Sequence, residues 1–538
     1  DQSIYDPQAI KNGVLEKNGF PVYTTGYDYP GPHQGNFCNN GIITADRAWT
    51  AKLTEVKKVY QNVKFTYSNG KLTLQNKYNF VNLENLFNLR YTLLCNGVVV
   101  EEKTVAAPFV APGYEGSVAL DIATELEQGK EYALNVELLK KEAEEWCEAG
   151  YPVAAEQFML QERTTLGYIA PDAETLTVDK SNGCKLSNSN ITFAVSPDGF
   201  VTEWVANGVK VLEPGEYPIY SNIRWIENES PYGEHKFGDY VAKINSASVS
   251  SALSGDGKTC NVTVNVQHSK CPYIVTYTVY ANGVVDMKID YSPNANGLRR
   301  IGLDMLFPAG YENVEYYAKG PWENYIDRQT GSFLGRYTTT VDDMFEMYPH
   351  PQSHGNRMAL RDLTMWNPEN GNTIKIETEG EVSFSLSHYD QRQYLTPELH
   401  PWDLKKDDVV YATFDYMQRG LGNGSCGPGT ENQYHCPAYQ TVSHKMRIST
   451  INGEDTGIAK VGVNVCNVEY DKASQTVVCT AVAEDTSVAV YNLGGTSVGK
   501  VVSSGDKAVV SLAGQPQGSY LLVIRHGDDV RTHKFVKW

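Results

Sequence analysis

The chain has 538 residues, which is too long for one hydrophobic core, and a usual domain size of roughly 100 to 200 residues predicts several domains. Hydrophobic residues make up 41% of it and charged residues 20%, a balance typical of globular proteins, and no apolar run is long enough to span a membrane. The net charge of -18, without any run of Lys or Arg, argues against nucleic acid as a partner.

Residues 1–52 are rich in Gly, Pro, Tyr and Asn and show no sustained apolar period, so we expect a long loop. A structureless run of this length is usually functional or belongs to a larger unit. The chain begins at Asp1 with neither an initiator Met nor a signal-peptide pattern, which predicts a cut N-terminus, either that of a mature secreted protein or that of a fragment of a longer one. A short helix is expected over 53–60, with Thr50 as its cap.

From Val63 the apolar residues alternate with polar ones, which is typical of half-buried strands. Asn69-Gly70 and Asn96-Gly97 each lie between two such runs, and this dipeptide is the strongest short signal for a hairpin turn. Short strands continue with frequent turns, so the pattern predicts an immunoglobulin-like β-sandwich over 53–163.

A much larger strand-rich region follows over 174–450, and its size predicts two large stacked sheets. A third strand-rich unit is expected over 459–538, with a hairpin over 492–501 and an apolar strand over 519–524. The sequence therefore predicts an all-β chain of three domains behind a leading segment.

Ten cysteines are scattered along the chain without any C-x-x-C pair, which argues against a metal-thiolate site. Cys260 and Cys271 flank a strand-turn-strand pattern and are candidates for a disulfide. The sequence leaves their redox state open.

The densest group of motifs spans residues 316–357, where aromatic residues alternate with Asn, Asp, Glu and Arg. Rings that stack on the C–H faces of a sugar, beside polar groups for its hydroxyls, are typical of a carbohydrate cleft. The alternative is that Asp327 with Arg328, and Arg336 and Arg357 with other carboxylates, form ion pairs that hold long loops together. On the residues alone the ion-pair interpretation is favoured.

Glycoside hydrolysis needs two carboxyl groups on either side of the scissile bond. Glu323 and Asp327 each lie near a basic residue that would keep them ionised, so we assign neither a catalytic role. His350 and His354 have the spacing of two helical metal ligands, but Pro351 between them argues against that helix.

Several blocks of this sequence resemble the β-galactosidases of glycoside hydrolase family 2. In the large β region they are GPWENYIDR (320–328), GRY (335–337), VDDMF (341–345), PQSHGNR (351–357) and DYMQRGLG (415–422). Upstream, residues 36–41 and 45–47 resemble the end of the family's catalytic TIM barrel, and 146–158 resembles the close of its second sandwich. The resemblance covers roughly residues 1–450.

The resemblance implies that residues 1–52 are the C-terminal remnant of the TIM barrel and that 174–450 forms a galactose-mutarotase-like supersandwich. Both catalytic glutamates of the family lie before the start of this chain, so we expect no catalytic residue here and no activity from the chain alone. Magnesium ligands also lie in that missing part, so magnesium is expected only in the parent enzyme.

The resemblance also implies site residues. Phe37 and Asn40 match positions that line the galactose pocket and bind a sodium ion there; the alternative is a plain turn at residues 39–41 anchored by Phe37. Cys426 stands where the family has a sugar-stacking Trp, so we expect it to line the aglycone side of the pocket without providing a stacking surface.

The function so implied is hydrolysis of terminal non-reducing β-D-galactosides with retention, by a parent protein that is a homo-oligomer. One alternative is a noncatalytic small subunit or carbohydrate-binding partner of a split β-galactosidase. Another is a sugar mutarotase, which requires a His and a carboxylate that converge in a cleft of the large β region.

The last 80 residues lie outside the resemblance. They look like the small sorting domains of exported bacterial enzymes, which implies a periplasmic or cell-surface protein, or like a plain appended immunoglobulin-like module.

Overall fold

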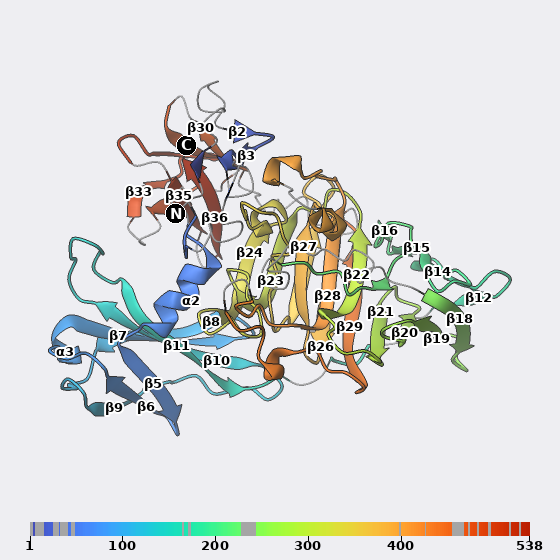
Figure 1. Ribbon diagram of the computed structural model, residues 1–538, viewed down its shortest axis with the longest axis horizontal. Helices are drawn as coiled ribbons and strands as arrows, with labels where there is room; N and C mark the ends of the chain where they lie inside the picture. Colours follow the sequence, from blue (N-terminus) through green and yellow to red (C-terminus); the bar gives the residue numbers. More distant parts are fainter. Residues whose placement is uncertain are drawn as a thin grey trace.

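The computed structural model describes residues 4–5, 16–24, 32, 41–44, 49–163, 166–169, 174–226, 244–396, 400–424, 427–453, 467–471, 474–480, 482, 484–492, 497–515, 518–526 and 529–537. These residues form nine antiparallel sheets with few helices (Figure 1), which confirms the expected all-β class. No helix in this part of the chain is long and apolar enough to cross a bilayer.

The described part of residues 1–52 contains short paired strands, where the sequence predicted only a loop. β1 (Ile4–Tyr5) pairs with β4 (Tyr23–Thr24), and β2 (Glu16–Lys17) pairs with β3 (Phe20–Pro21). Asn18 and Gly19, with φ angles of 53° and 80°, form the turn between β2 and β3. This Asn-Gly dipeptide is the signal that the sequence analysis missed.

Helix α2 (Ala51–Val59) follows, and the predicted helix near residue 53 is confirmed. Thr50 is its N-cap, because the Thr50 hydroxyl oxygen accepts a hydrogen bond from the Leu53 N–H. Trp49 donates its indole N–H to the Thr54 hydroxyl at 2.7 Å, which fixes the entry to the helix.

Two sheets enclose the first core. One holds three strands in the order β5 (Val63–Ser68), β6 (Lys71–Asn76) and β9 (Glu115–Ala119). The other holds four in the order β11 (Pro152–Gln161), β10 (Tyr132–Lys140), β7 (Phe87–Cys95) and β8 (Val98–Ala106), with α3 (Leu83–Leu86) before β7. The predicted hairpins β5–β6 and β7–β8 are confirmed, since each Asn-Gly turn has both φ angles positive.

Three sheets enclose the second and largest core. A nine-stranded sheet runs through the centre of the molecule (Figure 1). Its order is β18 (Ile244–Leu253), β19 (Thr259–His268), β20 (Tyr273–Tyr280), β21 (Val285–Tyr291), β29 (Val442–Ile451), β26 (Thr373–Glu379), β25 (Asp362–Trp366), β23 (Asn313–Gly320) and β24 (Phe333–Thr340).

Two smaller sheets pack against it, because their buried residues join the same core. The four-stranded sheet has the order β17 (Ile219–Tyr220), β22 (Arg300–Phe307), β28 (Val410–Gln418) and β27 (Ser383–Ser387). The five-stranded sheet has the order β12 (Thr177–Asp179), β13 (Cys184–Ser187), β14 (Ile191–Val195), β15 (Val201–Ala206) and β16 (Val209–Lys210). Single 3-10 turns lie in the connections: η5 (Asp342–Met344), η6 (Gln391–Leu395), η7 (Pro401–Asp403) and η8 (Asn432–Tyr434).

The C-terminal strands form a third core. One sheet holds β30 (Asn467–Asp471), β31 (Thr476–Thr480) and β34 (Lys507–Ser511), and the other holds β33 (Ser497–Val502), β32 (Ser487–Asn492), β35 (Gly518–His526) and β36 (Asp529–Lys537). The β32–β33 pair and β35 confirm the predicted hairpin and apolar strand.

Cys260 and Cys271 are buried free thiols, so the suggested disulfide is wrong for this structure. Cys260 lies at the start of β19 and Cys271 lies after its end, and a strand advances about 3.3 Å per residue, which separates them by far more than a disulfide spans.

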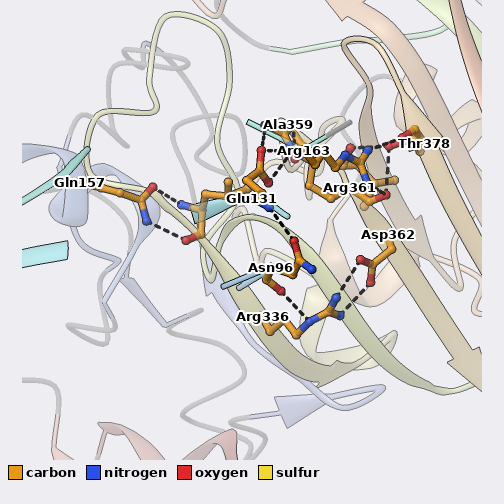
Figure 2. Close-up of polar contacts among 11 residues, drawn as sticks. Asn96, Glu131, Gln157, Arg163, Arg336, Ala359, Arg361, Asp362 and Thr378 are labelled. Carbon is orange, nitrogen blue, oxygen red and sulfur yellow. Dashed lines mark hydrogen bonds and ion pairs between the residues drawn. The ribbon is translucent and has the colours of Figure 1, made fainter. Parts of the chain in front are cut away.

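Polar contacts join the first sandwich to the nine-stranded sheet (Figure 2). The Glu131 carboxylate accepts hydrogen bonds from Arg361 Nε at 3.0 Å and Nη2 at 3.1 Å, with its side chain only 1% exposed. The Gln157 side-chain amide pairs with both the N–H and the C=O of Leu334, each at 2.8 Å, as a neighbouring strand would. Arg336 contacts the Asn96 carbonyl oxygen at 3.1 Å. The sandwich is therefore held against strands β24 and β25 by directed bonds.

Substituting Glu131→Gln should lower the free energy of unfolding by about 2 kcal/mol, because it leaves the half-buried guanidinium of Arg361 without the buried carboxylate that it contacts. Glu137→Gln is the matched control, since the Glu137–Arg90 pair lies on the same sandwich but is partly exposed, and a change under about 1 kcal/mol is expected. Urea unfolding of both variants is the measurement. An equally small loss of unfolding free energy in the two variants would show that Glu131 does not hold the two domains together.

His444, on β29, is a buried histidine whose two ring nitrogens have no hydrogen-bond partner among the described residues. Its ring lies 5.6 Å from that of Tyr291 on the neighbouring strand. Burial lowers the pKa of His444 to about 4. The unfolded chain therefore binds a proton that the folded chain does not, as the pH falls from about 6.5 toward 4.

Replacing this ring with an apolar side chain, His444→Leu, should reduce the loss of stability in acid. Between pH 6.5 and 4, the free energy of unfolding of the parent chain should fall by up to about 3 kcal/mol more than that of the variant. Other titrating groups cancel in this difference. Unfolding curves at pH 7, 6, 5 and 4.5 measure it, and parallel pH profiles would contradict the assignment.

Candidate functional site

The motif region forms a buried polar network around the loop 321–328, which follows β23. Asn324 holds the loop to the segment 354–358: its Oδ1 accepts from the Met358 N–H at 3.0 Å, and its own N–H donates to the Asn356 carbonyl at 2.7 Å. Tyr325 and Arg328 close a tight turn by exchanging backbone hydrogen bonds of 2.9 and 2.8 Å. The loop thus presents Glu323 and Asp327 to different neighbours.

Glu323 is the centre of the network. Its carboxylate, 1% exposed, accepts from Arg328 Nη2 at 2.6 Å, the Tyr348 hydroxyl at 2.5 Å and the Gly355 N–H at 2.8 Å. Burial alone would raise the pKa of Glu323, but Arg328 and these hydrogen bonds hold it well below its usual value. Glu323 is therefore an ionised anchor, as expected when we assigned it no catalytic role.

Lys52 connects this network to the N-terminal segment. Its ammonium group donates to the Gly41 carbonyl at 2.8 Å. Burial, and then the nearby charge of Arg328, lower the pKa of Lys52, while Glu323 opposes this shift. The stretch that directly follows Phe37 and Asn40 therefore lies close to the Glu323–Arg328 pair.

Asp327 points the other way, toward the loop 420–430. Its two carboxylate oxygens accept from the Leu421 N–H at 2.9 Å and the Gly422 N–H at 2.8 Å. The suggested pairing of Asp327 with Arg328 is wrong, because Arg328 pairs with Glu323 instead.

A second buried ion pair lies deeper. Arg300 Nη2 donates to Asp415 Oδ1 at 2.7 Å with both side chains fully buried, and Arg300 Nη1 donates to Asp304 at 2.7 Å. Gln418 connects this pair to the first network, since its amide donates both to Asp415 and to the Asn356 side chain.

The other suggested ion pairs have mixed outcomes. Arg336 contacts Asp362 at 2.8 Å and Glu315 at 3.0 Å, as the ion-pair interpretation expected. Arg357 instead donates to oxygens of Tyr316, Pro321 and Gly355, so its described partners are neutral.

His350 and His354 do not face a common site. No helix joins them, and His354 Nε2 lies 3.1 Å from the Tyr394 hydroxyl while His350 packs edge-on against Trp225. Burial lowers the pKa of His354 to about 4, which leaves it neutral.

Glu312, Asp342 and His388 are a group that could hold a metal ion, since one ligand atom of each lies within 4.8 Å of the others. Glu312 and His388 are, however, already hydrogen-bonded at 2.6 Å, and Lys406 pairs with Asp342 at 2.6 Å. This His-carboxylate contact leaves no room for a sugar between the two groups, so it does not support the mutarotase hypothesis.

Phe37, Asn40 and Cys426, which the sequence analysis assigned to the sugar pocket, lie outside the described residues. Their flanks are described: Gly41 accepts a hydrogen bond from Lys52, and Leu421, at the start of the loop 420–430, donates one to Asp327. Sequence reasoning missed Lys52 and Tyr348, because neither belongs to a motif and their partners are distant in the chain.

Similarity to known proteins covers most of the chain. Residues 186–448 match the family described as beta galactosidase small chain, and residues 72–161 match beta-galactosidase domain 4. The chain is 27% identical over 412 residues to a beta-galactosidase of Priestia megaterium (73% of this chain, 39% of that protein). It is also 27% identical over 415 residues to one of Vibrio cholerae (72% of this chain, 38% of that protein). The chain thus spans about two fifths of the length of these relatives.

Among solved structures, the galactose 1-epimerase of Lactobacillus acidophilus NCFM is similar with a TM-score of 0.27 and 8% identity, covering 54% of this chain and 98% of that one. A TM-score this low supports no assignment of fold family or function. The two family matches and the relatives over most of the chain identify it: the chain belongs to the β-galactosidase family and corresponds to a C-terminal portion of its members.

Proposed function

We propose that this chain is part of an enzyme of glycoside hydrolase family 2 that hydrolyses terminal non-reducing β-D-galactosides with retention. In this proposal the catalytic carboxylates lie outside the chain, on a barrel domain of which residues 1–52 are the end. Phe37 and Asn40 line the galactose pocket and hold a sodium ion, and Cys426 lines the aglycone side. The magnesium site of the enzyme lies in the rest of the barrel.

The observation that carries this proposal is that three acidic residues of the motif region are already bound to other protein groups. A glycosidase needs a carboxylic acid and a carboxylate that face an open space from both sides of the sugar. Glu323 is bound to Arg328, Asp327 to backbone N–H groups and Asp415 to Arg300. These three carboxylates therefore support the scaffold, which favours a catalytic pair located elsewhere.

The packing of Phe20 gives further support. Its ring lies 5.6 Å from Phe345 and 6.4 Å from Tyr389, in an apolar cluster on the large β domain. The segment 16–22 thus docks on this domain, as the end of a catalytic barrel held against it would.

The purified chain should release no galactose from a chromogenic β-galactoside at a rate typical of enzymes, because we propose that it lacks the acid and the nucleophile. A longer protein that includes the barrel should hydrolyse the same substrate, and it is the positive control. Turnover by the chain alone would contradict the proposal, as would an inactive longer protein.

A second candidate is the noncatalytic small subunit of a split β-galactosidase, favoured by the match of residues 186–448 to a small chain. An in-frame barrel directly upstream in the gene would reject it. Restored activity on mixing this chain with a separately expressed barrel-containing chain would support it.

We also propose that residues 459–538 serve as a sorting domain of an exported protein and that the full-length protein is a homo-oligomer. Fractionation of cells that produce the protein with and without these residues, and light scattering of the full-length form, test them.

A further inference from the structure

The loop 420–430 follows β28, and its described ends, 420–424 and 427–430, are held by hydrogen bonds to each other and to η8. The Gly420 N–H donates to the Tyr434 carbonyl at 2.9 Å, and the Thr430 hydroxyl donates to the Gly420 carbonyl at 3.1 Å. The Asn423 N–H donates to the Pro428 carbonyl at 3.1 Å. These bonds join the two ends of the loop to each other and to η8.

Asp327 attaches this loop to the loop 321–328. Because each of its two oxygens accepts from a different successive N–H, of Leu421 and Gly422, the carboxylate fixes both the position and the orientation of the loop base. Gly422 has a φ of 62°, a left-handed conformation that suits glycine.

The contact is also tight. A Cβ atom on Gly420 would lie 2.6 Å from Asp327 Oδ2 and 2.9 Å from Thr430 Cγ2, so any larger residue would push the loop off the carboxylate. The backbone conformation of Gly420 does not itself require glycine. Close approach to Asp327 is therefore the reason for glycine at this position.

Asp327 is held in turn by the buried network. It precedes Arg328, whose guanidinium is bound to Glu323, in the turn closed by Tyr325 and Arg328. The same network lies next to Lys52, which contacts Gly41. The loop 321–328 therefore holds the loop 420–430 through Asp327 and lies near Lys52.

We infer that Asp327 is a positioning residue, which fixes the loop 420–430 at the rim of the galactoside pocket and thereby sets the fit of the aglycone. This inference rests on the proposed function for the location of the pocket. Asp327 does not touch the reacting atoms, so its loss should weaken binding of the leaving-group side of the substrate and leave the chemical step nearly unchanged.

Two variants perturb the contact from opposite sides. Asp327→Asn keeps the shape but offers one acceptor oxygen for two N–H groups, while Gly420→Ala keeps the carboxylate and displaces the loop. Asp256→Asn is the matched control, because Asp256 also accepts from a turn, through Ser254 and Lys258, but on the distant β18–β19 hairpin.

The first readout is hydrogen exchange, which needs no activity. In the longer protein with its barrel, the amides of Leu421 and Gly422 should exchange roughly tenfold faster in both Asp327→Asn and Gly420→Ala, and at the parental rate in Asp256→Asn. Unchanged exchange in the two loop variants would overturn the positioning role.

The second readout is steady-state kinetics on an aryl β-galactoside. Both loop variants should raise KM roughly tenfold with kcat within about twofold, and the double variant should be no worse than the singles. A merely structural defect would lower the active fraction, and hence the apparent kcat, without moving KM.

Faster exchange with unchanged KM would overturn the placement of this loop at the pocket rim. Absence of hydrolysis by the parental protein would instead reject the proposed function, and the exchange data would still decide the role of Asp327.

Discussion

The buried charge of Glu323 is the constraint on which the surrounding loops depend. A carboxylate excluded from water must be compensated inside the protein, or its burial costs several kcal/mol. The compensation comes from Arg328, Tyr348 and Gly355, on segments that approach from different strands of the large β domain. Two oxygens can accept from all three only when the loops 321–328 and 346–357 keep one relative arrangement, so this ion pair determines the local fold.

The rest of the candidate site follows from that arrangement. Asp327 leaves the same turn and holds the loop 420–430, and Lys52 of helix α2 lies near the Glu323–Arg328 pair, so the network adjoins segments on both sides of the proposed pocket. The contacts of Glu131 with Arg361 and of Gln157 with Leu334 hold the first sandwich against the nine-stranded sheet (Figure 2). They thereby fix the position of the sandwich relative to the large β domain. Polar contacts therefore position both the domains and the loops next to the proposed pocket.

The sequence could predict features that are encoded locally. The hairpins at Asn69-Gly70 and Asn96-Gly97 were found because two residues specify the turn, and Asn18-Gly19 was missed only because its strands are two residues long. The partners of Glu323 could not be predicted from the sequence. Tyr348 and Gly355 lie 25 and 32 residues from it along the chain, and only the folded loops bring them together. Pairing Asp327 with its neighbour Arg328 failed because adjacent side chains of the turn point to opposite sides.

The dependence of this region on one buried ion pair is tested most directly by a double-mutant cycle on Glu323→Gln and Arg328→Met, with the free energy of unfolding as the readout. Each single variant leaves one buried polar partner uncompensated, whereas the double variant removes both charges. The account predicts a coupling energy of about 2 kcal/mol or more, with the double variant less destabilised than the sum of the singles. Additive effects, within about 0.5 kcal/mol, would contradict it.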